Sequence, residues 1–175
     1  MLDILQKRRS IRKFQRKEIP QNIITDLLKA ALLAPSSRNL CPWEFVVVND
    51  RGLLQKLASA KEHGSDFLQD APLGIVIIAD ETKSDVWVED ASIAAIIIQL
   101  AAESMGIGSC WIQIRNRMHD QKVTAEDYIK RLLSIPDKFK VEAVLALGYA
   151  NEEKAPHKEK DFQFNKVYSN EYGRN

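Results

Sequence analysis

Hydrophobic and polar positions along the chain follow two different periods, which predicts helices and strands mixed within one domain. Apolar residues at helical spacing predict helices at residues 2–9, 20–34, 53–58, 90–105 and 124–133. Apolar runs bounded by turn residues predict strands at residues 43–48, 73–79, 109–114 and 141–148. This mixture, without an internal repeat, predicts a single α+β domain over residues 1–175, with a sheet of at least four strands flanked by helices.

The helix predicted at residues 90–105 is apolar on nearly every face. Residues 93–98 read Ile-Ala-Ala-Ile-Ile-Ile, and Gln99 is the first interruption. A helix that is apolar all round must be covered on all sides, and a chain of this size has little material for that. We therefore expect a second subunit to cover it. A central helix within one subunit is the alternative.

Two stretches carry little hydrophobic patterning. Residues 61–70 are polar and contain Gly64, so we expect a mobile loop there. Residues 151–160 are polar and rich in lysine, and a short segment with several aromatic residues follows them.

Composition and charge narrow the function. The chain holds 25 Lys and Arg against 24 Asp and Glu, a formal charge of +1, which is low for a nucleic-acid-binding protein. We expect no nucleic-acid partner. No secretory signal and no apolar run long enough to cross a bilayer is evident, and two cysteines are too few for a disulfide framework. We therefore expect a reduced, cytoplasmic protein without membrane contact.

The basic charge is concentrated near the start of the chain. Residues 8–13 contain Arg8, Arg9, Arg12 and Lys13 around the hydroxyl of Ser10. Arginine presents a planar fork of donors that suits phosphates. The cluster is either a solvated basic patch or a cradle for one phosphorylated cofactor.

Several familiar chemistries are absent from the sequence. The three histidines are scattered without metal-ligand spacing, so we expect no metal site. No P-loop or nucleophile elbow occurs, and Gly106-x-Gly108 follows a predicted helix instead of a strand. Cys110 with His119 is a weaker alternative, since nothing supplies an orienting third group. Polar patches without a catalytic dyad indicate a cofactor that brings its own chemistry.

Four motifs together resemble the nitroreductase family, in order and spacing along essentially the whole chain. They are Arg8-Arg9-Ser10-Ile11-Arg12-x-Phe14, Ala34-Pro35-Ser36-Ser37-x-Asn39-x-x-Pro42-Trp43, Gly106-Ile107-Gly108-Ser109-Cys110-Trp111-Ile112 and Leu147-Gly148-Tyr149. The short chain is similar to the compact branch of that family.

The resemblance implies a fold, a cofactor and a reaction. The fold would be an α+β sandwich with a mostly antiparallel central sheet, forming an intertwined homodimer with FMN at the interface. NADH or NADPH would deliver hydride to the flavin and leave. A nitroaromatic, quinone or similar oxidised acceptor would then take the electrons, which is a ping-pong mechanism.

The resemblance also implies the site. Its twelve residues would be Arg8, Arg9, Ser10, Arg12, Pro35, Ser36, Ser37, Asn39, Trp111, Ile112, Lys158 and Lys160. The residues before Arg12 would contact the phosphate and ribityl chain, and Arg12 the pyrimidine edge of the isoalloxazine. The 35–39 segment would come from the partner subunit, residues 111 and 112 would contact the ring through their backbone, and the tail lysines would pin the phosphate. No catalytic side chain is implied, because the flavin performs the redox step while Arg12 tunes it.

The sequence departs from the family pattern at two places. Lys160 stands where many relatives carry arginine, and residues 61–70 show no clear match to the polar ring contacts of larger relatives. Two alternatives on the same fold therefore stay open: a flavin-binding protein without NAD(P)H turnover, and a different flavin reaction.

Overall fold

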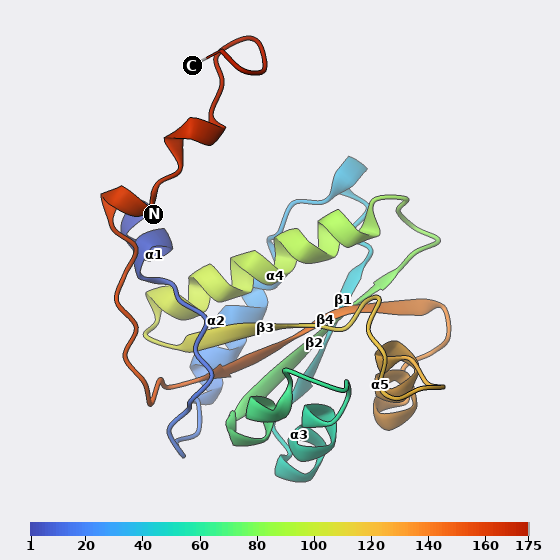
Figure 1. Cartoon of the computed structure of the whole chain (residues 1–175). Coiled ribbons are helices and arrows are strands. Elements are labelled where there is room, and N and C mark those ends of the chain that lie inside the picture. Colours follow the sequence, from blue (N-terminus) through green and yellow to red (C-terminus); the bar gives the residue numbers. More distant parts are fainter. Residues whose placement is uncertain (175) are drawn as a thin grey trace.

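The computed structural model describes residues 1–174 as an α+β sandwich around one antiparallel sheet (Figure 1). The strands are β1 (Trp43–Val48), β2 (Leu73–Asp80), β3 (Gly108–Gln113) and β4 (Phe139–Gly148). They lie in the order β1-β2-β4-β3, and each neighbouring pair is antiparallel. The predicted fold class is confirmed, and each of the four predicted strands is present within one or two residues at either end.

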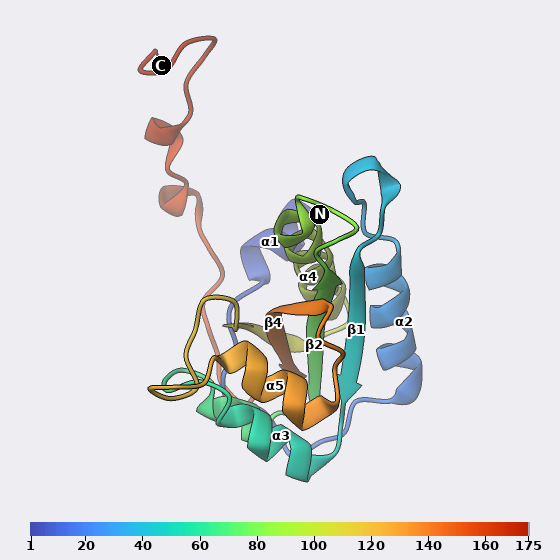
Figure 2. The same cartoon turned by 90° about the vertical axis from the view of Figure 1, so that its right-hand side faces the viewer.

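Helices cover both faces of this sheet (Figures 1 and 2). The helices α2 (Gln21–Leu32) and α4 (Trp87–Ser104) pack on one face, and α3 (Arg51–Ala58) and α5 (Ala125–Leu133) pack on the other. The short α1 (Leu2–Lys7) lies beside α4. Short 3₁₀ helices are η1 (Ser37–Asn39), η2 (Asp66–Asp70), η3 (Glu159–Asp161) and η4 (Phe164–Lys166).

The two central strands are buried on both faces, which explains their continuous apolar runs. Along β2, Ile75 and Ile77 pack toward α2 and α4, while Val76 and Ile78 pack toward α3 and α5. All eight residues of β2 are buried. The sheet is therefore a rigid platform whose edges position the surrounding segments.

The N-terminal segment approaches the sheet closely at a glycine. A Cβ atom on Gly108 would lie 2.9 Å from Cγ1 of Ile11, which is too close for any larger residue without movement. Ile11 is buried, with 7% of its surface exposed. The glycine at the start of β3 thus lets residues 8–14 lie directly along the end of the sheet.

Helix α4 is not fully covered within one chain. Residues such as Ala94, Ala95 and Ile98 are fully buried against the sheet, but Ile93 and Ile96 are 38% and 39% exposed. The alternative of a central helix covered within one subunit is therefore wrong, and cover by a second subunit stays a prediction. The helix is apolar all round, yet only one of its faces has a partner among residues 1–174.

The expectation of a mobile polar loop at residues 61–70 is wrong for its second half. Residues 66–70 form η2, and both Ser65 and Leu68 are fully buried. Two apolar residues, Phe67 and Leu68, anchor this turn to the core beside α3. A 3₁₀ turn of this length has no periodic signal that the sequence could reveal.

The C-terminal tail leaves the body of the molecule after β4. It passes α1 and then projects away from the sandwich (Figures 1 and 2). Several of its apolar side chains are exposed, namely Phe162, Phe164, Val167, Tyr168 and Tyr172. Across the described part of the chain, no helix combines the length and apolarity that a membrane span requires.

Candidate functional site

The basic N-terminal segment runs beside the start of β3. Ser10 forms a parallel bridge with Ser109, and the backbone N–H of Ile11 donates to the carbonyl of Ser109 at 3.0 Å. Farther along, the N–H of Gln15 donates to the carbonyl of Tyr149 at 2.9 Å. These bonds fix the backbone that carries the predicted phosphate-binding side chains.

The side chains of this segment separate into two groups. Arg8, Ser10 and Arg12 lie on the side of the buried Cys110 thiol: burial raises the pKa of that thiol, while Arg12, Ser10, Lys154 and Arg8 oppose the rise. Within residues 1–174, neither the Arg8 nor the Arg12 guanidinium group has a carboxylate oxygen within 4.0 Å. The two guanidinium groups and the hydroxyl of Ser10 thus belong to one segment, and neither guanidinium group is paired with an acid in residues 1–174.

Arg9 lies apart from that group. Its guanidinium group donates to the carbonyl of Ala155. Arg9 also lines a shallow hollow together with Glu103 and the Gly106–Gly108 turn. The structure therefore gives Arg9 a structural contact that holds the start of the tail.

An acid outside the predicted set fixes the backbone of the basic segment. One carboxylate oxygen of Glu152 accepts from the backbone N–H of Arg12 at 2.5 Å and of Lys13 at 3.1 Å. The hydrogen bond from Arg12 is the main reason that the pKa of Glu152 is lowered. Its other oxygen lies 3.6 Å from the ammonium of Lys154. Sequence reasoning missed this residue, because an acid in a polar tail looks like solvated charge.

Strand β3 lies at the edge of the sheet, so its outer backbone groups are open beyond Ser109. The side chain of Ile112 is 1% exposed, so this residue can offer a ligand only its backbone. Trp111 is half-buried, and its indole N–H donates to Oε1 of Gln113 at 2.9 Å. Their backbone contact with a planar ring stays a prediction.

Segment 61–70 also reaches the site, by a route the sequence did not reveal. The guanidinium carbon of Arg12 lies 5.8 Å from the centroid of the Phe67 ring, within cation–π range. Half-buried Lys61 lies near Arg117 and Cys110, and its pKa is lowered first by burial and then by Arg117.

The predicted 35–39 wall lies at the other end of the molecule. The backbone N–H of Ser37 donates to Asp90 in the first turn of α4 at 2.8 Å. The hydroxyl of Ser36 accepts from the N–H of Cys41 at 2.9 Å, and Pro35 and Asn39 are exposed beside them. The basic segment lies at the C-terminal end of α4, and an 18-residue helix spans about 27 Å. One chain does not bring these two halves together.

The tail lysines lie beside α1. The backbone N–H of His157 donates to the carbonyl of Gln6 at 2.9 Å, which straps the tail to this helix. The N–H of Lys158 donates to Asp161 at 2.8 Å and begins η3. Lys158 and Lys160 are both exposed, in the part of the tail that follows this contact with α1.

The structure gives no support to a nucleophile pair of Cys110 and His119. Nδ1 of His119 lies 2.9 Å from the carbonyl oxygen of Ser59, and its ring stacks on Tyr128 with centroids 4.0 Å apart. Burial raises the pKa of the Cys110 thiol, which keeps it protonated. Residues 1–174 hold no cluster of three metal-ligating side chains.

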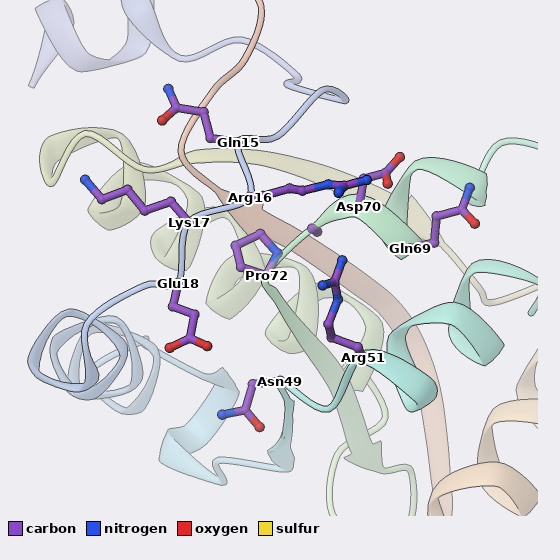
Figure 3. Close-up of a pocket in the computed structure, with 10 residues that line it drawn as sticks. Gln15, Arg16, Lys17, Glu18, Asn49, Arg51, Gln69, Asp70 and Pro72 are labelled. Carbon is purple, nitrogen blue, oxygen red and sulfur yellow. The ribbon is translucent and has the colours of Figure 1, made fainter.

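A separate hollow of about 160 Å³ lies beside Pro72 (Figure 3). Arg16 and Arg51 reach into it from opposite sides of Pro72, with Glu18 and Asp70 at its rim. None of the twelve predicted site residues lines it. The hollow is therefore distinct from the basic segment and from the edge of β3.

Comparison with known protein families identifies the fold. The model described as "Nitroreductase family" matches residues 5–63 and 53–149, which together cover most of the chain. The chain belongs to the nitroreductase family. The resemblance of the four sequence motifs is thereby confirmed.

Individual relatives agree with this membership. This nitroreductase-family chain is 40% identical over 168 residues to an Archaeoglobus fulgidus protein with the provisional name NADH dehydrogenase/NAD(P)H nitroreductase, covering 94% of this chain and 92% of that one. Among solved structures, an FMN-dependent nitroreductase from Clostridium difficile R20291 superposes with a TM-score of 0.97 at 49% identity, covering 98% of this chain and all of the other. A Bacteroides thetaiotaomicron structure, provisionally named NADH dehydrogenase/NAD(P)H nitroreductase, superposes with a TM-score of 0.89 at 30% identity, covering 98% and 97%.

Proposed function

We propose that the protein is an FMN-dependent oxidoreductase that uses NADH or NADPH to reduce nitroaromatics, quinones or similar oxidised acceptors. The names of its relatives support an oxidoreductase, and the C. difficile structure is of a protein described as FMN-dependent. The observation that carries the proposal is the pair of guanidinium groups of Arg8 and Arg12, which have no acidic partner among residues 1–174. The segment that carries them lies beside the edge strand β3, at the C-terminal end of α4.

The residues present fit FMN. The guanidinium groups of Arg8 and Arg12 lack acidic partners among residues 1–174, so both can bind an anion. Ser10 adds a hydroxyl, and the edge of β3 adds backbone groups that can meet the rim of a planar ring. The half-buried ring of Phe67 lies under Arg12 and limits where its guanidinium can point.

A second copy of the chain would complete the site. The exposed face of α4 carries Ile93 and Ile96, and two such faces would bury one another across a two-fold axis. If the two copies of α4 pack antiparallel, the N-terminal end of one lies beside the C-terminal end of the other. That arrangement brings Ser37 and Asn39 of one chain to Arg8 and Arg12 of its partner.

Within this site the side chains bind and orient rather than react. When bound, FMN would accept hydride from the nicotinamide and pass the electrons to the acceptor. Arg8 and Ser10 would hold the phosphate end, assisted by Lys158 and Lys160. Arg12 would place a fixed positive charge at the ring edge, where negative charge develops on reduction, and so would favour the reduced state. Arg9 would hold the start of the tail instead of the cofactor.

A visible absorption spectrum of the purified protein, followed by anaerobic addition of NADH or NADPH, tests the proposal. We expect a yellow protein that loses its colour with the nicotinamide and regains it with a nitroaromatic or quinone. A yellow protein that neither donor bleaches would indicate flavin binding without this turnover. A colourless protein that cannot be reconstituted with FMN would contradict the proposal altogether.

A further inference from the structure

Glu142 is a buried acid with an unsatisfied oxygen. The residue is 4% exposed, and within residues 1–174 its Oε2 atom has no hydrogen-bond partner. An unpartnered buried carboxyl group costs free energy, so its presence in the middle of a strand calls for a reason beyond packing.

The backbone around Glu142 is also irregular. The pairing of β4 with β2 shifts register between Ile77 and Ile78, which leaves Glu142 as the extra residue of a β-bulge. Its carbonyl accepts hydrogen bonds from the backbone N–H groups of both Ile114 and Arg115, at 3.2 and 3.1 Å. Bulges redirect individual side chains and are frequent next to active sites.

The redirected carboxyl group faces the strand that would meet the isoalloxazine. Nε2 of Gln113 lies 3.5 Å from Oε1 of Glu142, and Oε1 of Gln113 accepts from the indole N–H of Trp111 at 2.9 Å. A continuous polar connection therefore runs from the buried acid to the Trp111 side chain at the edge of β3.

We propose that Glu142 is a positioning residue for the flavin site, which acts through Gln113 on the Trp111 edge of β3 and makes that edge responsive to pH. The inference rests on the proposed function, because it concerns the ring end of the same FMN site. It adds a residue that lies outside the twelve predicted ones.

The surroundings of Glu142 favour its neutral form. Arg115 faces it from the end of β3 and Glu89 from α4, while Ile77 and Ile78 of β2 carry no charge. Burial raises the pKa of Glu142, the hydrogen bond from Gln113 and the charge of Arg115 oppose the rise, and Glu89 adds to it. Nε2 of Gln113 donates to the carbonyl of Arg115 at 3.2 Å, so its 3.5 Å contact with Glu142 is the longer of the two. Ionisation would strengthen and shorten this bond, pull on the Gln113 amide and so shift Trp111.

The test compares wild-type protein with Glu142→Gln, which keeps the size of the side chain and cannot ionise. Both proteins are reconstituted with FMN, and the rate constant for flavin reduction by NADH and the FMN midpoint potential are measured across pH. We expect the ratio of the two rate constants to change by about tenfold as Glu142 titrates, because one hydrogen bond changes between neutral and charged forms. The difference between the two midpoint potentials should follow the same titration.

Two further variants make the outcome decisive. Asp80→Asn removes a buried carboxylate of β2 that is hydrogen-bonded to Thr82 and has no contact with Gln113. The ratio of its flavin-reduction rate constant to that of wild type should therefore stay constant as Glu142 titrates. Gln113→Leu keeps Glu142 but removes the side chain that links it to Trp111. Its rate constant for flavin reduction should therefore lose the pH dependence that Glu142 causes, and this holds even if Glu142→Gln does not fold. Wild-type pH profiles in Gln113→Leu, or in a folded Glu142→Gln protein, would overturn the inference while FMN reduction itself persists. A wild-type protein that binds no FMN would instead overturn the proposed function on which the inference rests.

Discussion

The backbone N–H of Ser37 donates to the carboxylate of Asp90 at 2.8 Å, and this bond joins the 35–39 loop to the first turn of α4. The second oxygen of Asp90 accepts from the hydroxyl of Ser84 at 2.9 Å. The loop is therefore placed by the same helix whose exposed face would meet a second copy of the chain. Dimer formation and completion of the cofactor site would then be one structural event.

Replacement of Asp90 by Ala tests the loop contact. Asp90 is 2% exposed, and its loss leaves the amide of Ser37 and the hydroxyl of Ser84 unpaired. We expect the free energy of unfolding to fall by about 2–4 kcal/mol and the affinity for FMN to fall with it. Chemical denaturation and FMN titration measure the two effects, and Asp90→Asn should be milder in both. Unchanged FMN affinity in the Ala variant would remove the loop from the site.

Replacement of Arg12 by Ala tests whether this residue mainly sets the midpoint potential of the flavin or mainly binds FMN. A fixed positive charge at the ring edge favours the reduced flavin, so its loss should lower the midpoint potential and slow reduction by NADH. The expected loss is about 1.5–3 kcal/mol in the free energy of reduction, with a smaller effect on FMN affinity. Lys13→Ala is the matched control, because its backbone also binds Glu152 while its side chain is exposed. A variant that loses only FMN affinity would show that Arg12 does not lie at the ring edge.

Replacement of Ile96 by Asp tests the exposed face of α4. In a two-fold interface the substitution occurs twice, and each buried isoleucine contributes about 1.5–3 kcal/mol. We expect the dimer to dissociate at least about a hundredfold more readily, with parallel loss of FMN, as measured by analytical ultracentrifugation and flavin absorbance. Thr25→Asp, on the exposed side of α2, adds the same charge elsewhere and should do neither. A monomeric wild-type protein that still holds FMN would contradict the shared site.

The raised pKa of Glu142 predicts an unusual dependence of stability on pH in the apoprotein. Because the folded state binds this proton more tightly than the unfolded state, its contribution is fully present below about pH 4.3, the ordinary glutamate value. That contribution is lost as pH rises through the higher pKa of the folded state. Glu142→Gln should therefore gain stability relative to wild type with rising pH, as measured by urea denaturation at one protein concentration.

The pKa of Asp80 is shifted in the opposite direction, so its effect on stability has the opposite dependence on pH. Hydrogen bonds from Thr82 lower the pKa of Asp80, so its contribution is present at neutral pH and is lost as the solution becomes acidic. Asp80→Asn should lose stability relative to wild type at neutral pH and approach it in acid. If both variants showed the same slope, the environment assigned to Glu142 would be wrong.

The sequence predicted what depends on local pattern. The strands were visible because β2 and β4 are buried on both faces, which leaves continuous apolar runs in the sequence. Of the predicted basic cluster, Arg8 and Arg12 influence the pKa of the same buried thiol as Ser10, and their role toward a cofactor stays a prediction.

The remaining features depend on tertiary contacts. The separate position of Arg9 follows from the course of the tail, which places the carbonyl of Ala155 within its reach. Phe67 and Glu142 were missed for a related reason: one lies in a short 3₁₀ turn, and the other in a bulge that only strand pairing creates. Neither the 3₁₀ turn nor the β-bulge produces a periodic pattern of side chains in the sequence.

The claim that two chains build each FMN site can be tested most directly by mixing two defective variants. One carries Arg8→Ala and Arg12→Ala, and the other carries Ser37→Asp and Asn39→Asp, which place negative charge opposite the phosphate and the ring. Each alone should bind little FMN. Purified heterodimers with two different affinity tags should bind one FMN per dimer, because one of their two sites then receives two intact halves. Heterodimers that bind no FMN would show that each site lies within a single chain, and this would contradict the account.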